Sequence, residues 1–289
     1  MMNKGLFWLL IVYIGVLFSG AELAAVAYIG MQYLDGLFSL NWIQYLAHKP
    51  LCQYVDRFRV VGFFLLLPYI CKKNNVHMKD LGLHLDHKKY IVAFCSGCGL
   101  WILLFSVRAV MVGGIVPREM LSVPLWPIFI ASLLLAILEE IIFRGVIFEF
   151  FRKNYSETFS MCLLALLFAC LHFSICTLGD ATNTFLHAVQ CAYHSLVAIF
   201  THIQWPYFVS LLLLSCLLVR LRLSFRSLWV SIGFHQGLVF VLMLLRKKYM
   251  FMNEGNAFWG AWGITDGWFS VVVLIFVLSY FWRIHEKTS

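Results

Sequence analysis

Long apolar runs separated by short charged segments extend through the whole chain. An α-helix needs about 20 mainly apolar residues to cross the hydrocarbon core of a bilayer. The pattern therefore predicts an all-α fold, a polytopic bundle of about eight transmembrane helices that forms a single membrane domain over residues 1–289. The predicted spans, the second of them short, lie at residues 6–30, 59–71, 90–112, 124–151, 158–176, 206–219, 228–245 and 266–283.

The composition agrees with a membrane protein. Hydrophobic residues make up 62% of the chain, charged residues only 12%, and the mean hydropathy is +0.85. A soluble domain of this length could not bury so much apolar surface. The formal net charge is +8, but the basic residues stand in short blocks and form no stripe for nucleic acid. We therefore expect a lipid bilayer around the chain and no nucleic-acid partner.

The basic blocks predict the orientation, because positive residues collect in cytoplasmic loops. Both termini then share the cytoplasmic side with the basic residues Lys72, Lys73, Lys79, Lys88, Lys89, Arg152, Lys153, Arg220, Arg222 and Arg226. Residues 182–205 form a further apolar segment, which we place at the membrane interface because a crossing there would move the later arginines to the opposite face. Residues 246–248, Arg-Lys-Lys, fall on the opposite side and do not fit this orientation.

Two acids and an arginine interrupt the fourth apolar run, in Leu138-Glu139-Glu140-Ile141-Ile142-Phe143-Arg144-Gly145. A charge inside a membrane span is costly and by default marks a functional site. Glu140 and Arg144 are four residues apart, so on a helix they can form an ion pair. Glu139 lies about 100° further round the helix, where a carboxylate without a cation is a candidate general base. The alternative is that all three charged residues form one ion-pair cluster that holds helices together.

Two histidines occupy later apolar runs. His172 lies in Phe168-Ala169-Cys170-Leu171-His172-Phe173, and His235 lies in Gly233-Phe234-His235-Gln236-Gly237. Taken singly, each is typical of a core histidine bonded to a backbone carbonyl. Together with Glu139, the two imidazoles could activate a water, stabilise an oxyanion or bind a metal. One carboxylate and two imidazoles also form the ligand set of a zinc hydrolase, so a divalent metal such as zinc at Glu139, His172 and His235 stays open.

These pieces occur in a familiar order. Glu139-Glu140-x-x-x-Arg144, Phe168-x-x-x-His172 and a later span with His235 resemble the motifs of the CAAX-protease and bacteriocin-processing (CPBP, or ABI) family of intramembrane endopeptidases. The resemblance runs from about residue 81 to about residue 283 and includes Arg222-Leu223-Ser224-Phe225-Arg226-Ser227-Leu228-Trp229. The ordered set inside membrane spans is more specific than the acidic motif alone.

The resemblance implies a role for each of these residues. Glu139 would be the general base, His172 would help to position the attacking water, and His235 would help to stabilise the tetrahedral oxyanion. Glu140 and Arg144 would be supports. The family also implies a peptide or protein substrate at the membrane, while its dependence on metal is left open. The compact loops favour a bacterial inner membrane, and the sequence names no substrate.

One position departs from the family pattern. The family has an asparagine four residues after the histidine of its last motif, and this chain has Val239. Gln236 lies on a different helix face, and the loss of one oxyanion donor can cost on the order of a hundredfold or more in rate. The alternative function is therefore a weak or inactive family member that acts as a membrane immunity or scaffold protein. A transporter is less favoured, because no inverted repeat is visible.

Two further groups have competing interpretations. His187, Cys191 and His194 follow one helical face at i, i+4 and i+7, a spacing that could offer three soft ligands to zinc or copper. We prefer interfacial histidines, because no fourth ligand is evident. Cys95-Ser96-Gly97-Cys98 resembles a redox motif only in its letters, and we interpret its small residues as a close helix contact.

Overall fold

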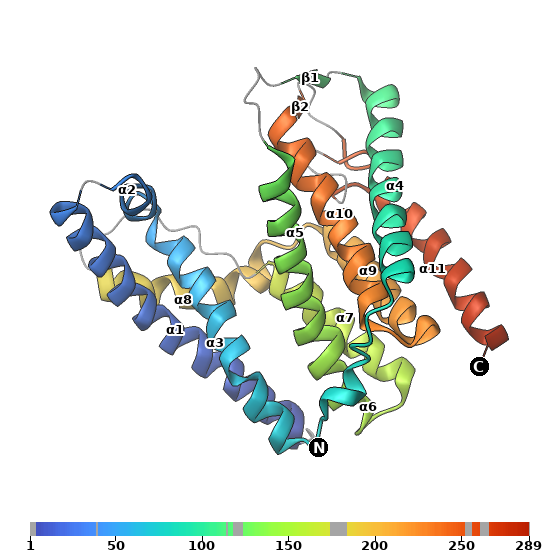
Figure 1. Cartoon of the computed structure of the whole chain (residues 1–289), viewed down its shortest axis with the longest axis horizontal. Helices are drawn as coiled ribbons and strands as arrows, with labels where there is room; N and C mark the ends of the chain where they lie inside the picture. Colours follow the sequence, from blue (N-terminus) through green and yellow to red (C-terminus); the bar gives the residue numbers. More distant parts are fainter. Residues whose placement is uncertain are drawn as a thin grey trace. The chain divides into compact units, whose positions relative to one another are not determined.

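The protein is almost entirely helical in the residues that the structure describes (Figure 1). The computed structural model describes residues 4–38, 40–113, 115–117, 124–173, 184–251, 256–260 and 266–288. The helices group into two compact units, which we treat separately. The first unit comprises Met1–Tyr69 and Cys170–Ile203, and the second comprises Ile70–Ala169 and Gln204–Ser289. The predicted all-α fold is confirmed, and the assignment of residues 1–289 to one membrane domain stays a prediction.

Every predicted span corresponds to a helix, but not every helix is long enough to cross a bilayer. Of the described helices, five are sufficiently long and apolar, namely Val12–Leu37, His87–Val112, Leu125–Arg152, Trp205–Phe225 and Leu228–Lys247. Glu157–His172 and Trp268–Arg283 are apolar but shorter. The helical membrane bundle is therefore confirmed, whereas the five helices that meet this criterion are fewer than the spans predicted. Residues 174–176 of one predicted span lie outside the described residues.

The first unit is built from α1 (Lys4–Leu37), α2 (Asn41–Ala47), most of α3 (Leu51–Lys73) and α8 (Thr184–Thr201). α8 packs along α1, and both helices present alanines to the contact, as close helix packing in membranes favours. The buried core consists of Leu17, Ala21, Ala24, Ala25, Leu51, Cys52, Tyr54, Val55, Ala188, Cys191 and Ala192. The apolar segment predicted at 182–205 thus forms a packed helix, and its place at the membrane interface stays a prediction.

The second unit is organised around α10 (Leu228–Lys248). α10 packs against α4 (His87–Val112), α5 (Leu125–Glu139) and α9 (Trp205–Phe225), and α9 packs against α11 (Trp268–Thr288). α7 (Glu157–His172) completes the helices of this unit up to Ala169. A short antiparallel pair, β1 (Ile115–Pro117) with β2 (Tyr249–Phe251), joins the ends of α4 and α10.

Glycines bring α4 and α10 into backbone contact. A Cβ at Gly97 of α4 would collide with the carbonyl oxygen of Phe234, and a Cβ at Gly237 of α10 would collide with the carbonyl oxygen of Phe94. The predicted close contact around Gly97 is therefore confirmed. His235 stands two residues before Gly237, which turns its side chain about 160° away from α4. The glycine contact thus directs His235 toward the opposite side of α10.

Candidate active site

The span that carries the acidic motif changes its helix type at the motif. α5 ends at Glu139, and the next eight residues, Glu140–Ile147, form a π-helix (η2) before α6 (Phe148–Arg152). The N–H of Phe148 bonds to the carbonyl of Phe143, five residues earlier. π-Helical segments are rare and frequently occur at functional sites. The apolar pattern had predicted one uninterrupted span over residues 124–151, without this change of register.

Arg222 of α9 bonds to a backbone carbonyl of the π-helix η2. In an α-helix the Arg144 carbonyl would accept from Phe148, but here it accepts from Nη1 of Arg222. Nη2 of Arg222 donates to Oε1 of Glu149 at 2.6 Å and to the carbonyl of Asp80 at 2.9 Å. The side chains of Arg222 and Glu149 are buried. The planar guanidinium, with several fixed donors, therefore holds η2 and α6 to α9.

The prediction that Arg220, Arg222 and Arg226 lie in a charged loop is wrong for the first two. α9 continues to Phe225, so Arg220 and Arg222 lie in its last turns, and each is only 5% exposed. Arg220 Nη1 lies 3.5 Å from Oε1 of Glu157, and its guanidinium stacks 3.6 Å from the centroid of the Trp282 ring. The helix can extend through these charges because acidic and aromatic partners accompany them.

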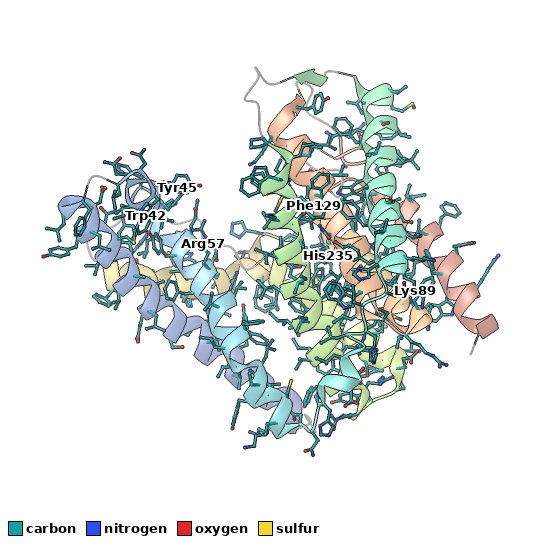
Figure 2. The ribbon with its side chains drawn as sticks, viewed as in Figure 1. Trp42, Tyr45, Arg57, Lys89, Phe129 and His235 are labelled. Atoms are coloured by element: carbon teal, nitrogen blue, oxygen red, sulfur yellow. The ribbon has the colours of Figure 1, made fainter. Side chains whose placement is uncertain are left out.

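Glu140 is the centre of a buried charged group. Its Oε1 lies 3.1 Å from Nη1 of Arg144 and 2.8 Å from Nδ1 of His235. The side chains of Glu140 and Arg144 have no exposed surface, and the Arg144 guanidinium lies 4.2 Å from the centroid of the Phe168 ring. The predicted ion pair is therefore present. The bond at Nδ1 also fixes the orientation of the His235 ring, which lies inside the second unit (Figure 2).

Glu139 lies at the other nitrogen of the same imidazole. Its Oε2 is 3.8 Å from Nε2 of His235. This separation is too long for a direct hydrogen bond but suits one water that contacts both atoms. Oε2 of Glu139 makes no hydrogen bond with the described residues. The Glu139 side chain is 23% exposed, whereas that of Glu140 is fully buried. The His235 imidazole therefore lies between a fully buried carboxylate, that of Glu140, and a partly exposed one, that of Glu139.

His172 is the last residue of α7 and is partly buried. It falls in the first unit, while Glu139 and His235 belong to the second. Phe168, one turn earlier on the same face of α7, packs on Arg144 and Phe143. The predicted contact of His172 with the two site residues stays a prediction.

The donor set of the second unit does not by itself fit a zinc centre. Zinc takes three or four protein ligands. Glu139 and His235 offer two atoms, and Oε1 of Glu140 already pairs with Arg144 and His235. Among the described residues of this unit, no third His, Cys, Asp or Glu joins Glu139 and His235 in a metal-sized cluster. The predicted metal ligation therefore depends on His172.

Val239 occupies the place of the family's asparagine, one turn after His235 on α10, and is partly buried. Gln236 does not replace the missing donor at this place. It is fully buried, and its Oε1 accepts a hydrogen bond from the hydroxyl of Tyr90 on α4. This contact agrees with the prediction that Gln236 lies on a different face of the helix from His235.

Two residues that support the site escaped the sequence interpretation. Arg222 was counted as a loop charge, although it lies in the stretch that carried the family resemblance. Glu149 received no role, although it stands in the apolar run Val146-Ile147-Phe148-Glu149-Phe150-Phe151. The rule that singled out Glu139 and Glu140, a charge within an apolar run, applies equally to Glu149.

Comparison with known proteins identifies the region that carries the site. Together, the apolar helices and the buried charges define a helical membrane protein with an internal polar site. Residues 121–241 match the family model described as Rce1-like, type II CAAX prenyl endopeptidase Rce1-like. This region of the chain is therefore Rce1-like, which confirms the resemblance to the CAAX-protease family. Searches of curated proteins and of solved structures found no match.

The matched region contains all five predicted site residues, Glu139, Glu140, Arg144, His172 and His235. It covers the central part of the region from residue 81 to residue 283 over which the sequence shows the resemblance. The chain is accordingly an integral membrane protein, surrounded by lipid, and its residues 121–241 match the Rce1-like family model.

Proposed function

We propose that the protein is an intramembrane endopeptidase that hydrolyses a peptide bond with a water activated by Glu139. One observation carries the proposal. Oε2 of Glu139 lies 3.8 Å from Nε2 of His235, whose other nitrogen is held by the buried Glu140. A base and a ring nitrogen at this separation can share one water. The family match supports peptide hydrolysis as the reaction class.

In the proposed reaction, Glu139 removes a proton from the water while the water oxygen bonds to the scissile carbonyl carbon. The carbonyl electron pair moves onto the carbonyl oxygen, to which Nε2–H of the protonated His235 donates. The carboxylate of Glu140 accepts from Nδ1–H and so holds the imidazole in the orientation for this contact. Glu139 then returns its proton to the leaving nitrogen as the C–N bond breaks. The family resemblance adds His172 as a residue that positions the water.

The test compares the wild type with Glu139→Gln in proteoliposomes. The probe is a quenched fluorescent peptide that ends in a prenylated cysteine followed by three residues, and cleavage is confirmed by mass spectrometry. Loss of a general base should lower the rate by a factor on the order of 10²–10⁴. Glu22→Gln is the matched control, since Glu22 is exposed in α1 of the first unit and should keep the full rate. Equal turnover by Glu139→Gln and the wild type would overturn the mechanism.

A second candidate function is favoured by Val239. With Val239 at the family's asparagine position and Gln236 bonded to Tyr90, an oxyanion donor of the family is missing. The protein would then be a weak or inactive relative that serves as a membrane immunity or scaffold protein. Val239→Asn distinguishes the two functions. A gain in cleavage rate of about tenfold or more would indicate an attenuated enzyme, whereas no cleavage by either form, together with cellular function of the Glu139→Gln variant, would favour the scaffold.

We also infer that the host membrane is a bacterial inner membrane, because some of the connections between helices are very short. α9 and α10, for example, are separated by two residues, Arg226 and Ser227. Fractionation of cells that express the tagged protein tests this assignment, and recovery with an internal membrane of a eukaryotic cell would contradict it.

A further inference from the structure

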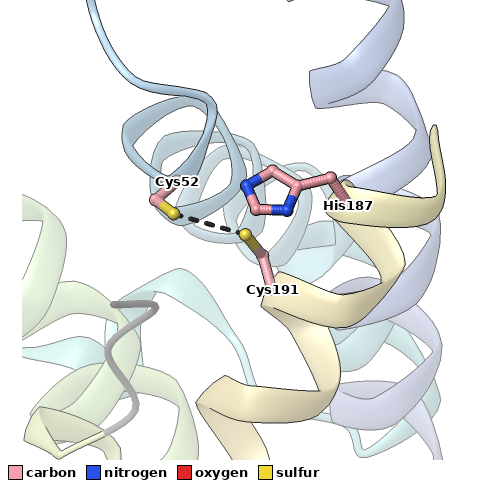
Figure 3. Close-up of side chains that lie close together, drawn as sticks. All are labelled: Cys52, His187 and Cys191. Atoms are coloured by element: carbon pink, nitrogen blue, oxygen red, sulfur yellow. Dashed lines mark hydrogen bonds between the residues drawn. The ribbon is translucent and has the colours of Figure 1, made fainter. Parts of the chain in front are cut away.

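Three side chains of residue types that can bind a metal meet inside the first unit (Figure 3). Cys52 comes from the first turn of α3, while His187 and Cys191 lie one turn apart on α8. One ligand atom from each residue lies within 4.8 Å of the other two. Cys52 is 8% exposed, His187 5% and Cys191 0%. Figure 3 shows the imidazole of His187 beside the two sulfur atoms.

We propose that Cys52, His187 and Cys191 form a zinc site that ties α3 to α8. Thiolate and imidazole are preferred ligands of zinc, with Zn–S near 2.3 Å. Tetrahedral geometry then places two thiolate sulfurs about 3.8 Å apart, whereas a disulfide needs about 2.05 Å. The sulfur atoms of Cys52 and Cys191 are 3.3 Å apart. A small increase in the distance between the two sulfur atoms therefore gives the zinc geometry. A disulfide would need a much larger decrease in that distance.

Charge balance favours zinc over a monovalent ion. Cys52 and Cys191 belong to the buried apolar core of the first unit, together with Ala24, Ala188 and Ala192. When both thiols have lost their protons, two thiolates, a neutral imidazole and Zn²⁺ carry no net charge together, which suits a buried apolar site. Cu⁺ would leave one negative charge.

Zinc with three protein ligands commonly takes a water as the fourth. Ser195 lies one turn after Cys191 on the same face of α8. Its hydroxyl is fully buried and has no hydrogen-bond partner in the described part of the chain. We assign to Ser195 a hydrogen bond to that water.

The site joins two distant parts of the chain. Cys52 and Cys191 are 139 residues apart, and they belong to the two separate segments that make up the first unit. The sequence pattern had grouped His187 and Cys191 with His194, but His194 is exposed. Periodicity along one helix cannot reveal a ligand that another helix supplies. The zinc would tie the two segments to each other.

The test measures zinc bound to the purified full-length protein. The wild type is loaded with Zn²⁺ under reducing conditions, freed of excess metal, and analysed by mass spectrometry of the elements. About one zinc per chain is expected for the wild type, and at least a fivefold loss for Cys52→Ser and for His187→Ala. His194→Ala and Cys95→Ser are the matched controls, because both side chains are exposed. Glu139→Gln should keep its zinc, so this result is independent of the proposed protease site.

A spectroscopic measurement guards against variants that fail to fold. Co²⁺ in the wild type should give thiolate-to-cobalt charge-transfer absorption and the intense visible bands of a tetrahedral site, and Zn²⁺ should remove them. A wild type that binds less than about a tenth of an equivalent of zinc under these conditions would overturn the proposal. Binding of Cu⁺ without binding of Zn²⁺, or zinc lost equally from the His194→Ala control, would also overturn it.

Discussion

The two carboxylates beside the His235 imidazole differ in their burial and in their pairing with an arginine. At Nδ1, Glu140 is fully buried, and its Oε1 bonds to His235 and forms an ion pair with Arg144. Oε2 of Glu140 has no hydrogen-bond partner among the described residues. At Nε2, Glu139 is partly exposed, and its Oε2 makes no hydrogen bond within the described residues. The two adjacent acids, Glu139 and Glu140, therefore have different roles. A buried carboxylate that pairs with an arginine can orient a ring, whereas one without an arginine pair can accept a proton from water.

The largest effect on stability is expected when the ion pair between Glu140 and Arg144, on the Nδ1 side of His235, is removed. Arg144→Met leaves the Glu140 carboxylate buried with its cation removed, which should cost about 3–5 kcal/mol. The apparent melting temperature in detergent and the yield of folded protein measure this loss.

Arg152→Met is the control for that change. Arg152 also pairs with a glutamate, Glu149 at 2.9 Å, but its side chain is 43% exposed. An exposed pair contributes about 0–1 kcal/mol. Equal melting temperatures for Arg144→Met and Arg152→Met would show that burial of the Glu140–Arg144 pair does not set its importance.

A smaller effect on stability is expected at the contact between α4 and α10, on the side of α10 opposite to His235. The Cβ of Gly97→Ala meets the carbonyl of Phe234 in the backbone of α10. The two helices must move apart, at a cost of about 1–3 kcal/mol. Because His235 moves with α10, the rate of peptide cleavage should fall as well.

Gly99→Ala is the matched control on the same helix, since a Cβ there meets nothing within 4 Å. Alanine is also the better helix former, by roughly 0.5–1 kcal/mol. If Gly97→Ala were as stable and as active as Gly99→Ala, the close contact between α4 and α10 would not position His235.

The sequence was sufficient for those parts of the site that depend on one helix. Glu140 and Arg144 were paired correctly because their spacing is local, and the apolar runs located the longer helices but not α2. The π register of η2 was not visible, because eight residues are too few to separate a period of 3.6 from a longer one. The order of motifs gave the family, although no local pattern could show that Glu140 bonds to His235, 95 residues later.

The charges of α9 show a second reason for failure. Arg222 was interpreted with the rule that positive residues collect in loops. That rule describes uncompensated charges, and Arg222 has Glu149 and two backbone carbonyls as partners. Cys52 shows the same limitation, since its neighbours His187 and Cys191 come from a helix that is distant in sequence. Partners that meet only through the tertiary fold cannot be predicted from spacing along one segment.

Glu139→Gln should have the smallest effect on stability of these variants and the largest effect on catalysis. Oε2 of Glu139 has no hydrogen-bond partner among the described residues, so the change should alter the melting temperature by no more than the equivalent of about 1 kcal/mol. Single-turnover cleavage of the prenylated peptide probe by the reconstituted protein, measured beside its melting temperature, tests the central claim most directly. The account predicts folded protein with cleavage lowered by a factor on the order of 10²–10⁴. Folded Glu139→Gln protein that cleaves at the wild-type rate would contradict it.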